Sequence, residues 1–408
     1  MKILLITYYF PPCGGAPVQR WLRFLPLLIE RGHQITVITS QGGDYPFIDE
    51  SLCEKIPPAV NVIRVPAFKM ASLWQKFSGS GGEIPYGKLP EERKGLSRLL
   101  IWLRLNLIIP DLRVFWNPKA LRACFIELSR KPYDAIITTG PPQSTHLIGL
   151  SLSKRLGMKW FADFRDPFSQ IHYLKLNPPS RLSMAVYKYL EKKVISSADL
   201  NLVVSGAIAE ALPEGRKLVI HNGYDPQDFA GIEYTPAEQM RIKYIGQFTQ
   251  GQDIGLISAL CSALNRPYSL SLIGSKIGAK EEAQLRMIAS DRLIVKPFVP
   301  HAEAVREMVQ SELLLLIVND YEGNRGMLTT KLFEYLASRT PILCLSADDT
   351  AAARIIQECQ AGKSFGYQQI SKAAVWVNQL QTGTRMQGDI LSYSVEHQID
   401  KLNIALRS

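Results

Sequence analysis

The stretch NRGMLTTKLFEYLASRTP, residues Asn324 to Pro341, is the part of the sequence that decides the fold. It follows one apolar run, Leu313 to Val318, and precedes another, Ile342 to Leu345. Short apolar runs on either side of a helical segment are typical of buried parallel strands joined by a crossover helix. The stretch therefore predicts a strand, a helix and a further strand of one parallel sheet.

The predicted helix carries Lys331 and Glu334, which lie three residues apart and so share one helix face. The free N–H groups and the dipole at a helix N-terminus favour an anion. Such a helix can hold a diphosphate through its start and Lys331, and a ribose diol through Glu334. The alternative is a surface lysine–glutamate pair on an ordinary strand–helix unit.

The same alternation of apolar runs and helical segments continues along the whole chain and gives twelve expected strands. The remaining expected strands are Lys2–Tyr8, Gln34–Thr39, Val60–Val65, Ala135–Thr139, Lys159–Phe164, Leu200–Val204, Lys217–His221, Arg241–Ile245, Ser269–Ile273 and Leu293–Lys296. Twelve strands divide naturally into two sheets of about six.

Turn residues mixed with a short strand between Pro213 and Phe229 mark the expected division of the chain. The fold class expected is α/β, with two facing Rossmann-like domains over residues 1–213 and 214–387. Ligands of such folds bind at the carboxyl ends of parallel strands, so we expect a deep cleft between the two domains to hold the substrate.

The composition fits a soluble globular protein of more than one domain, because 46% of its 408 residues are hydrophobic and 21% are charged. The net charge of +10 requires an anionic partner, which can be a nucleic acid, a phosphorylated substrate or an acidic lipid. Six scattered cysteines without a CxxC pair indicate reduced thiols in a cytoplasmic protein. The N-terminal apolar run is too short for a signal peptide, and no apolar run is long enough to cross a bilayer.

An insertion at about residues 78–116 interrupts the alternation. Its first part, Ser78 to Pro90, has the composition of a flexible loop. Its second part is amphipathic, with Trp102 among leucines and with arginines that include Arg98 and Arg104. A basic, tryptophan-bearing segment of this kind can lie in the interface of an anionic membrane. The alternative is a core-facing helix with a solvated basic edge.

Two places in the first half have the residue types of a binding or catalytic site. Gly14 and Gly15 follow the first strand and leave backbone N–H groups open beside a helix start, although a simple turn would use the same residues. Asp163, Arg165 and Asp166 follow the strand Lys159–Phe164. They can orient sugar hydroxyls, accept a proton or contact a phosphate, or they can form an internal salt bridge.

In the second half, Gly246 ends a strand in the turn YIGQF, where a backbone without a side chain allows close approach of a phosphate. His301 is a possible phosphate or sugar contact, although an exposed or capping histidine is more common. The sequence has no Asp-x-Asp motif and no histidine cluster at metal-ligand spacing, so a divalent metal is not expected.

Taken together, these segments resemble family 4 glycosyltransferases of the GT-B fold, of the type that works on bacterial surface polysaccharides. The resemblance covers nearly the whole chain and depends on the order and spacing of six pieces. They are KILLITYYFPPCGGAPVQRWLRFLPLLIERGHQITVIT, YDAIITTGPPQSTHLIGLSLSKRLGMKWFADFRDPF, ADLNLVVSGAIAEAL, LVIHNGYDPQDF, IKYIGQF and GMLTTKLFEYLASRTPIL.

The resemblance implies that Glu334 binds the donor ribose and Lys331 the donor diphosphate. It implies that Gly14 and Gly15 border the donor phosphate or the acceptor. Arg165 stands where many relatives have a histidine that faces the transferred sugar. The resemblance also implies that a last helix, within residues 388–408, packs back on the N-terminal domain.

The chain departs from the family pattern at three further positions. Gly326 stands where relatives often have the first of two glutamates, and it is expected near the donor. Gln247 and Gln252 stand near the places of an arginine and a lysine.

The function implied is a retaining, metal-independent glycosyltransferase that uses a sugar nucleotide, most often a UDP-sugar, and no other cofactor. The N-terminal domain would bind the acceptor, a hydroxyl of a glycan or a lipid-linked glycan in surface polysaccharide or lipopolysaccharide synthesis. Residues Asp163, Arg165 and Asp166 would serve catalysis, and Gly14, Gly15, Gly246, Gly326, Lys331 and Glu334 would bind the donor. The expected location is the cytoplasm, at the anionic inner face of the plasma membrane, without a nucleic-acid partner.

Three other functions fit parts of the pattern. A sugar-nucleotide epimerase of related fold would need more acid and base side chains around the sugar than the second half supplies. A non-catalytic subunit would only bind the sugar nucleotide or the membrane. A nicotinamide-dependent oxidoreductase would need a GxGxxG turn after the first strand, which is absent.

Overall fold

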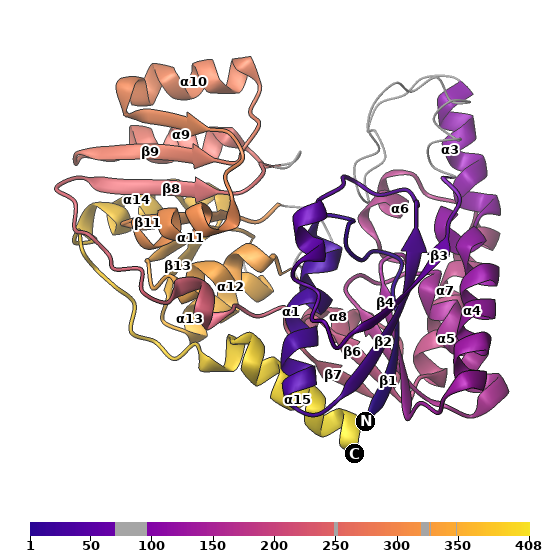
Figure 1. Ribbon diagram of the computed structural model, residues 1–408. Helices are drawn as coiled ribbons and strands as arrows, with labels where there is room; N and C mark the ends of the chain where they lie inside the picture. The colour runs from indigo at the N-terminus through magenta and orange to yellow at the C-terminus, as the bar shows by residue number, and fades with distance from the viewer. Residues whose placement is uncertain (70–95, 249–251, 320–325, 327, 348) are drawn as a thin grey trace. The chain divides into compact units, whose positions relative to one another are not determined.

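The structure of the protein is a computed structural model that describes residues 1–69, 96–248, 252–319, 326, 328–347 and 349–408 (Figure 1). The chain forms two compact units: unit 1 comprises Met1–His221 and Ile399–Ser408, and unit 2 comprises Asn222–Gln398. The division falls later than the expected boundary after residue 213, because strand β7 (Lys217–Val219) pairs with β6 (Leu200–Val203) of unit 1. The predicted loop Ser78–Pro90 lies outside the described residues.

Within its described residues, unit 1 is built on a parallel sheet of seven strands in the order β3-β2-β1-β4-β5-β6-β7. The first five strands along the chain are β1 Lys2–Ile6, β2 Gln34–Gln41, β3 Asn61–Pro66, β4 Ala135–Gly140 and β5 Lys159–Phe164. The strand order reverses between β1 and β4, and this switch point is where ligands of doubly wound sheets bind.

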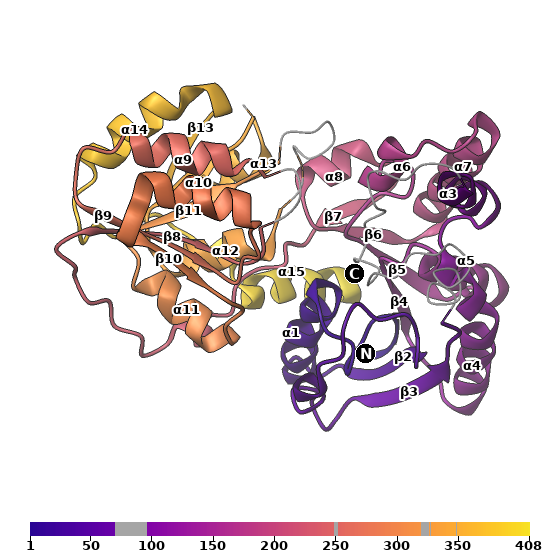
Figure 2. The ribbon, with the colours of Figure 1, turned by 90° about the horizontal axis from the view of Figure 1, so that it is seen from above.

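Helices cover both faces of this sheet, as Figures 1 and 2 show, with α4, α5 and α7 on one face and α1 on the other. The helices of unit 1 are α1 Ala16–Glu30, α3 Leu96–Leu107, α4 Asn117–Arg130, α5 Thr145–Leu156, α6 His172–Leu176, α7 Arg181–Ser197 and α8 Gly206–Ala211. Buried apolar side chains cover both faces of the central strands: Leu4, Ile136 and Trp160 on one face, and the alternating residues Leu5, Ile137 and Phe161 on the other.

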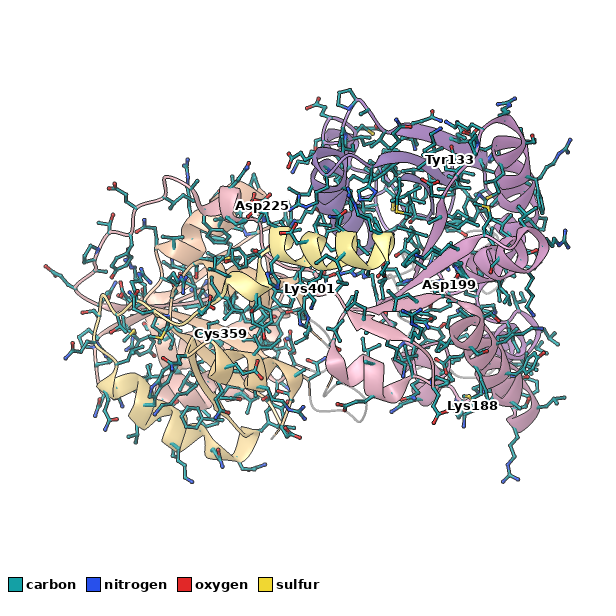
Figure 3. All side chains as sticks on the ribbon, turned by 90° about the horizontal axis from the view of Figure 1, so that it is seen from below. Tyr133, Lys188, Asp199, Asp225, Cys359 and Lys401 are labelled. Carbon is teal, nitrogen blue, oxygen red and sulfur yellow. The ribbon has the colours of Figure 1, made fainter. Side chains whose placement is uncertain are left out.

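The last helix, α15 (Val395–Arg407), contributes its residues from Ile399 onward to unit 1. Lys401, labelled in Figure 3, donates a hydrogen bond of 2.9 Å to the carbonyl oxygen of Val219. Asp400 pairs with Arg31 at 2.7 Å, and Leu402 is completely buried. These contacts attach the end of the chain to α1 and β7.

In the part of unit 2 that the structure describes, a parallel sheet of six strands has the order β10-β9-β8-β11-β12-β13. The strands are β8 Met240–Ile245, β9 Tyr268–Ile273, β10 Leu293–Lys296, β11 Leu313–Ile317, β12 Ile342–Leu345 and β13 Gly362–Phe365. The helices are α9 Ile254–Ser262, α10 Ala279–Ala289, α11 His301–Val309, α12 Thr330–Ala337, α13 Ala351–Glu358 and α14 Ile370–Gln379. Here the order reverses between β8 and β11.

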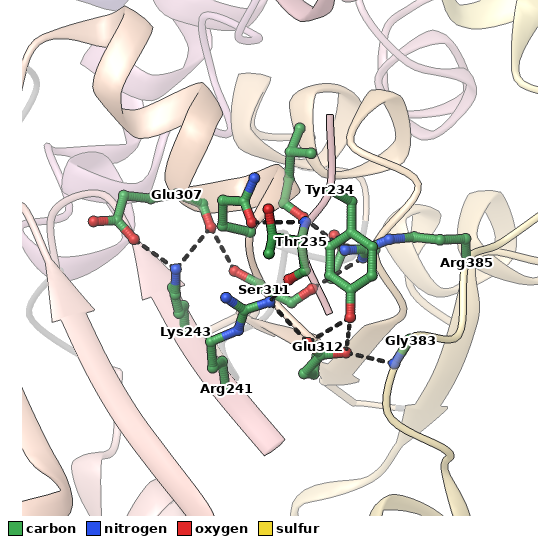
Figure 4. Close-up of polar contacts among 12 residues, drawn as sticks. Tyr234, Thr235, Arg241, Lys243, Glu307, Ser311, Glu312, Gly383 and Arg385 are labelled. Atoms are coloured by element: carbon green, nitrogen blue, oxygen red, sulfur yellow. Dashed lines mark hydrogen bonds and ion pairs between the residues drawn. The ribbon is translucent and has the colours of Figure 1, made fainter. Parts of the chain in front are cut away.

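A buried polar network fixes two connecting segments to the amino ends of β8 and β11 (Figure 4). The carboxylate of Glu312 accepts hydrogen bonds from Tyr234 Oη, Arg241 Nη2 and Gly383 N, at 2.7 to 3.0 Å. Beside it, Lys243 pairs with Glu307 at 2.5 Å. These charges have close partners and lie at the amino ends of the strands, away from the carboxyl ends where ligands of such sheets bind. They therefore support the fold and do not form a binding site.

The expected fold class, two Rossmann-like domains with parallel sheets, agrees with the structure. All twelve expected strands are present with small shifts at their ends, and the structure adds β13. The sequence of β13, GKSF, has no apolar run, because as an edge strand it joins the sheet through its backbone. A Cβ on Gly362 would lie 1.9 Å from the carbonyl oxygen of Ile342, so the pairing requires glycine.

Candidate functional site

The switch point of unit 2 brings two glycine turns together at the ends of neighbouring strands. Gly246 follows β8 with a φ of 113°, and Gly274 follows β9 with a φ of 76°. A Cβ added to Gly274 would lie only 3.6 Å from Gly246 Cα. Ser275 Oγ donates to the carbonyl oxygen of Gly246 at 2.7 Å. The result is a rigid edge of bare backbone, on which a ligand can approach the main chain closely.

Lys331, in the first turn of α12, lies directly against this edge. A Cβ on Gly246 would be 2.9 Å from Lys331 Cε and 3.0 Å from Nζ, so a side chain here would displace the ammonium group. Lys331 Nζ also lies 4.0 Å from the centre of the Tyr244 ring. Among the residues that the structure describes, Nζ has no hydrogen-bond or salt-bridge partner.

This environment changes the protonation of Lys331. Burial lowers its pKa from 10.5 to about 7, and the charge of Glu334 opposes part of that change. An anion bound beside Nζ would favour the charged form and raise the pKa again. The amine is therefore positioned for a negatively charged ligand, not for an internal ion pair.

Glu334 lies one turn further along α12 and contacts a histidine from another element. His301 Nε2, at the start of α11, is 3.2 Å from Glu334 Oε1 and 3.9 Å from Asp228 Oδ2. The side chain of Glu334 is largely covered, while that of His301 is 41% exposed. The structure thus brings together Lys331, Glu334 and Gly246 as the sequence suggested. It adds His301 as a direct neighbour of Glu334.

Tyr335 fixes α12 to the strand that ends at this site. Its hydroxyl accepts a hydrogen bond from Ile245 N at 2.9 Å and donates one to Ile245 O at 3.3 Å. Because Ile245 directly precedes Gly246, this side chain sets the distance between Lys331 and the glycine turn. Gly326, the remaining residue expected near the donor, is buried, and both of its neighbours in the chain lie outside the described residues.

At the end of β5 in unit 1, Asp163 is completely buried and held from three sides. Arg20 pairs with it through Nη2 at 3.0 Å and Nε at 3.2 Å. Trp21 Nε1 and Thr139 Oγ1 donate to Oδ2 at 2.9 and 2.8 Å. A carboxylate with these partners stabilises the positions of α1, β4 and β5. The internal salt bridge that the sequence left open is therefore present, but its arginine is Arg20 and not Arg165.

Arg165 and Asp166 have a different environment, since both are only partly covered. Within the described residues neither side chain forms a hydrogen bond, and Arg165 Nη1 is buried without a partner. Burial raises the pKa of Asp166, and the nearby Arg165 charge opposes this. Gln143 Nε2 donates to the Asp166 backbone at 2.7 Å and fixes the loop. This pair is the part of the expected catalytic set that is available to a ligand.

The turn after β1 also differs from the expected phosphate loop. A Cβ on Gly14 would lie 2.1 Å from the ring of Phe47, and Gly14 N donates to Phe47 O at 3.0 Å. Gly15 has a φ of 103° and caps α1. Both glycines are required by packing and by the backbone, so their presence has a structural explanation whether or not they border a ligand.

Two buried polar residues of unit 1, Arg20 and His146, were not among the residues expected to act in the site. Arg20 is an isolated charge on the apolar face of α1, and this was the available signal of a buried pair. His146 stacks on Phe164 at 4.5 Å, and its Nδ1 is 2.9 Å from Thr138 Oγ1. Burial lowers its pKa to about 3, so the ring is neutral and cannot supply a proton near pH 7.

In the described ranges, no group of three or more histidine, cysteine, aspartate or glutamate side chains could hold a metal ion. Metal independence stays a prediction. A helix long and apolar enough to span a membrane is not found among the described residues.

Comparison with known proteins identifies the fold. No protein-family model and no curated protein sequence matches the chain. Solved structures match along its whole length: HepE of Anabaena in complex with UDP and glucose has a TM-score of 0.62 at 14% identity, covering 100% of this chain and 99% of that one. Sucrose-phosphate synthase from Thermosynechococcus elongatus has a TM-score of 0.58 at 16% identity, covering 100% and 96%.

The apo form of the lipopolysaccharide outer core galactosyltransferase WaaB has a TM-score of 0.59 at 13% identity, covering 100% of this chain and 99% of that one. At these identities the similarity establishes the architecture, which is that of glycosyltransferases of the GT-B type. The GT-B fold expected from the sequence is therefore confirmed.

Proposed function

We propose that the protein is a glycosyltransferase that transfers a sugar from a nucleotide diphosphate, in the first place UDP, to a hydroxyl of a glycan or lipid-linked acceptor. One observation carries this proposal: the uncompensated amine of Lys331 lies against the bare backbone of Gly246, with Glu334 one helical turn away. This arrangement combines an anion site with a carboxylate on the same face of one helix, as a nucleoside diphosphate requires.

In the proposed donor site, Lys331 and the first turn of α12 bind the diphosphate, and Glu334 accepts hydrogen bonds from the ribose hydroxyls. Gly246 and Gly326 allow the phosphates to approach the backbone. The similarity in fold to HepE, which was solved with UDP and glucose, supports UDP as the nucleotide. The site acts without a metal, because Lys331 supplies the positive charge that the leaving diphosphate requires.

Unit 1 binds the acceptor in this proposal. The bond between the sugar C1 and the diphosphate oxygen breaks, and a bond from C1 to the acceptor oxygen forms on the same face of the sugar. Asp166, whose pKa is raised by burial, takes the proton of the acceptor hydroxyl, and Arg165 stabilises the negative charge beside it. Asp163 contributes by holding Arg20 and the ends of β4 and β5. Gly14 and Gly15 border the ligand.

Calorimetric titration of the full chain with UDP, UDP-glucose and GDP-mannose tests the donor site. We expect UDP and UDP-glucose to bind, and Lys331→Met to reduce UDP binding by at least tenfold. Lys280→Met, at an exposed lysine on α10, is the matched control and should bind normally. Absence of binding by all three nucleotides in the wild-type protein would contradict the proposal.

A second experiment separates the transferase from its alternatives. Incubation with UDP-glucose alone should leave the sugar unchanged, whereas an epimer would indicate a sugar-nucleotide epimerase. A Glu334→Ala variant that still supports normal glycan assembly in cells would favour a non-catalytic subunit. Loss of assembly in that variant, with the fold intact, is the result expected of a transferase.

The proposed acceptor in surface polysaccharide or lipopolysaccharide synthesis places the enzyme at the cytoplasmic side of an anionic membrane. Helix α7 supports this location, since its apolar residues Leu182, Val186 and Tyr189 are exposed on one face. The exposed basic residues of α7 are Arg181, Lys188 and Lys192. Its acidic residue, Glu191, is buried and hydrogen-bonded to Ser169. An apolar stripe flanked by cations is typical of helices that lie in a lipid interface.

Co-sedimentation with vesicles that contain phosphatidylglycerol tests this location. Leu182→Asp should reduce binding at low salt, because it places a charge in the apolar stripe. Met287→Asp, at a residue that is 87% exposed in unit 2, is the matched control. Equal sedimentation of both variants would argue against membrane contact through α7.

A further inference from the structure

Two arginines of the insertion are partly covered by unit 1. Arg104 lies in α3, and Arg113 lies in a short 3₁₀ helix, Leu112–Trp116. Arg104 belongs to the amphipathic segment for which the sequence left open a membrane interface or a core-facing helix. In the structure both are partly covered, while Trp102 on α3 is 46% exposed. Membrane contact of this segment stays a prediction, and the partial cover of its two arginines requires an explanation of its own.

The two side chains lie near each other and near residues that follow strands of unit 1. Arg113 is close enough to interact electrostatically with Tyr8 and Tyr9, which follow β1. Arg104 interacts in the same way with Tyr173 on α6, the helix that follows the β5 loop. Helices α3, α6 and α7 group around one end of this sheet in Figures 1 and 2, joined by a shared apolar cluster.

Two positive charges, Arg104 and Arg113, lie near each other here, and no carboxylate of the described residues is bonded to either one. Burial lowers the pKa of Arg104, and the positive charge of Arg113 lowers it further. Asp111 is the carboxylate near both arginines, and Asp44 also faces Arg113. The Asp111 oxygens, however, accept from the backbone N–H of Arg113 and from Ser144 N and Oγ, at 2.8 to 2.9 Å. Burial opposes the charge of Arg113, but its neighbours, Asp111 and Asp44 among them, outweigh burial and raise its pKa. Within the described residues neither acid bonds to either of these two guanidinium groups.

As a consequence, hydrogen-bond donors exceed acceptors in this cluster. A guanidinium group carries five N–H donors. In the described residues, no hydrogen bond or salt bridge engages the guanidinium of Arg104 or Arg113, and Arg113 Nε is buried without a partner. Arg165 Nη1, at the end of β5, is a further buried donor of the same kind. Buried donors are almost always satisfied in folded proteins, so this set calls for a ligand rich in acceptor oxygens.

We propose that Arg104 and Arg113 bind a phosphate group of the acceptor substrate, which makes the acceptor a phosphorylated glycan or a lipid phosphate. This inference builds on the proposed function, because it specifies the acceptor of the same reaction. A phosphate offers several acceptor oxygens in different directions and matches two guanidinium forks at once. A neutral sugar would bring as many donors as acceptors and would leave the guanidinium N–H groups without charged acceptors.

Calorimetric titration with glycerol 3-phosphate, with glycerol as the uncharged control, tests the phosphate site in the full chain. Arg104→Gln and Arg113→Gln should each weaken glycerol 3-phosphate binding by about tenfold or more, since each removes charge-assisted hydrogen bonds. Arg122→Gln, at an exposed arginine on α4, makes the same change of charge and should bind as the wild type does. Equal affinity in all three variants, or no binding by the wild type, would overturn the inference.

Folding of each variant is checked by circular dichroism. If a glutamine variant does not fold, Arg113→Lys replaces it. This change keeps the charge but loses the planar fork, and it should weaken binding by a smaller factor. The inference would also be overturned if Arg113→Lys and Arg104→Lys both folded and bound glycerol 3-phosphate as the wild type does.

UDP binding, measured on the same samples, distinguishes failure of this inference from failure of the proposed function. Normal UDP binding with no glycerol 3-phosphate binding would remove the phosphate site alone. If the wild type did not bind UDP, the proposed donor site, and with it the proposed function, would be wrong. Vesicles containing phosphatidic acid then identify the source of the phosphate. If the vesicles compete with glycerol 3-phosphate, and Arg104→Gln abolishes this competition, the site binds a lipid phosphate. If glycerol 3-phosphate binds and the vesicles do not compete with it, the site binds a free phosphorylated glycan.

Discussion

Replacement of Lys331 by methionine should make the free protein more stable while it removes donor binding. Methionine has a similar length and no charge, so it keeps the contact with Tyr244 and Gly246. The pKa of Lys331 falls from 10.5 to about 7 in the folded protein. At about 1.4 kcal/mol for each pKa unit, charging this amine in place costs up to about 5 kcal/mol. Because the side chain keeps some hydration, we expect a gain of about 2 to 5 kcal/mol for Lys331→Met.

The sign of the pH dependence follows from the protons bound in each state. Between pH 7 and 10.5 the unfolded chain keeps the Lys331 proton and the folded protein does not, so the wild-type free energy of unfolding rises with pH. Below pH 7 both states bind the proton, and the full cost is present. The difference between Lys331→Met and the wild type should therefore be largest and constant below pH 7, and it should vanish as the pH approaches 10.5.

Urea denaturation at pH 6, 8 and 9.5 measures these differences, and calorimetry measures UDP binding on the same samples. Lys280→Met should stay within about 0.5 kcal/mol of the wild type at every pH, because its side chain is exposed. If Lys331→Met were less stable than the wild type at pH 6, or if the difference did not depend on pH, the described environment of the amine would be wrong.

Three further predictions follow from the same contacts. UDP affinity should fall by about tenfold for each pH unit above 7 as Lys331 loses its proton, and a flat calorimetric profile from pH 7 to 9 would contradict this. Asp163→Asn should lower the free energy of unfolding by about 3 to 5 kcal/mol because Arg20 remains charged and buried, whereas Asp166→Asn should change it by less than about 1 kcal/mol in the same urea titration. Gly246→Ala should weaken UDP binding by more than about tenfold, because a φ of 113° is strained for alanine and the methyl group would displace the Lys331 ammonium. Wild-type affinity in that variant would show that the turn is not part of the site.

The fold was predicted correctly for strands and turns whose formation depends on residues that are consecutive in the sequence. Apolar runs such as Leu313–Ile317 are buried on both faces, and this burial produces the pattern from which the strands were predicted. β13 was missed because it has no such pattern: an edge strand is held by its backbone and does not need a continuous apolar run. The glycine turn at Gly246 was recognised because its conformation excludes most other residues.

The candidate site was only partly predictable. Lys331 and Glu334 were found together because they share one helix, whose period fixes their spacing. The assignment of the charges after β5 could not distinguish Asp163, which is fully bonded, from Asp166, which is not. Arg20 lies 143 residues from Asp163 in the chain, and the spacing of residues contains no signal for such a pair.

The sequence by itself determined the two parallel sheets and the helix with Lys331 and Glu334, because helical periodicity and strand burial produce recognisable patterns of consecutive residues. Only the tertiary structure decided which charges are paired, which have no partner among the described residues, and how far Arg104 and Arg113 are covered. Those properties depend on the distance between side chains from separate segments and on the water excluded between them. Neither quantity exists until the chain has folded.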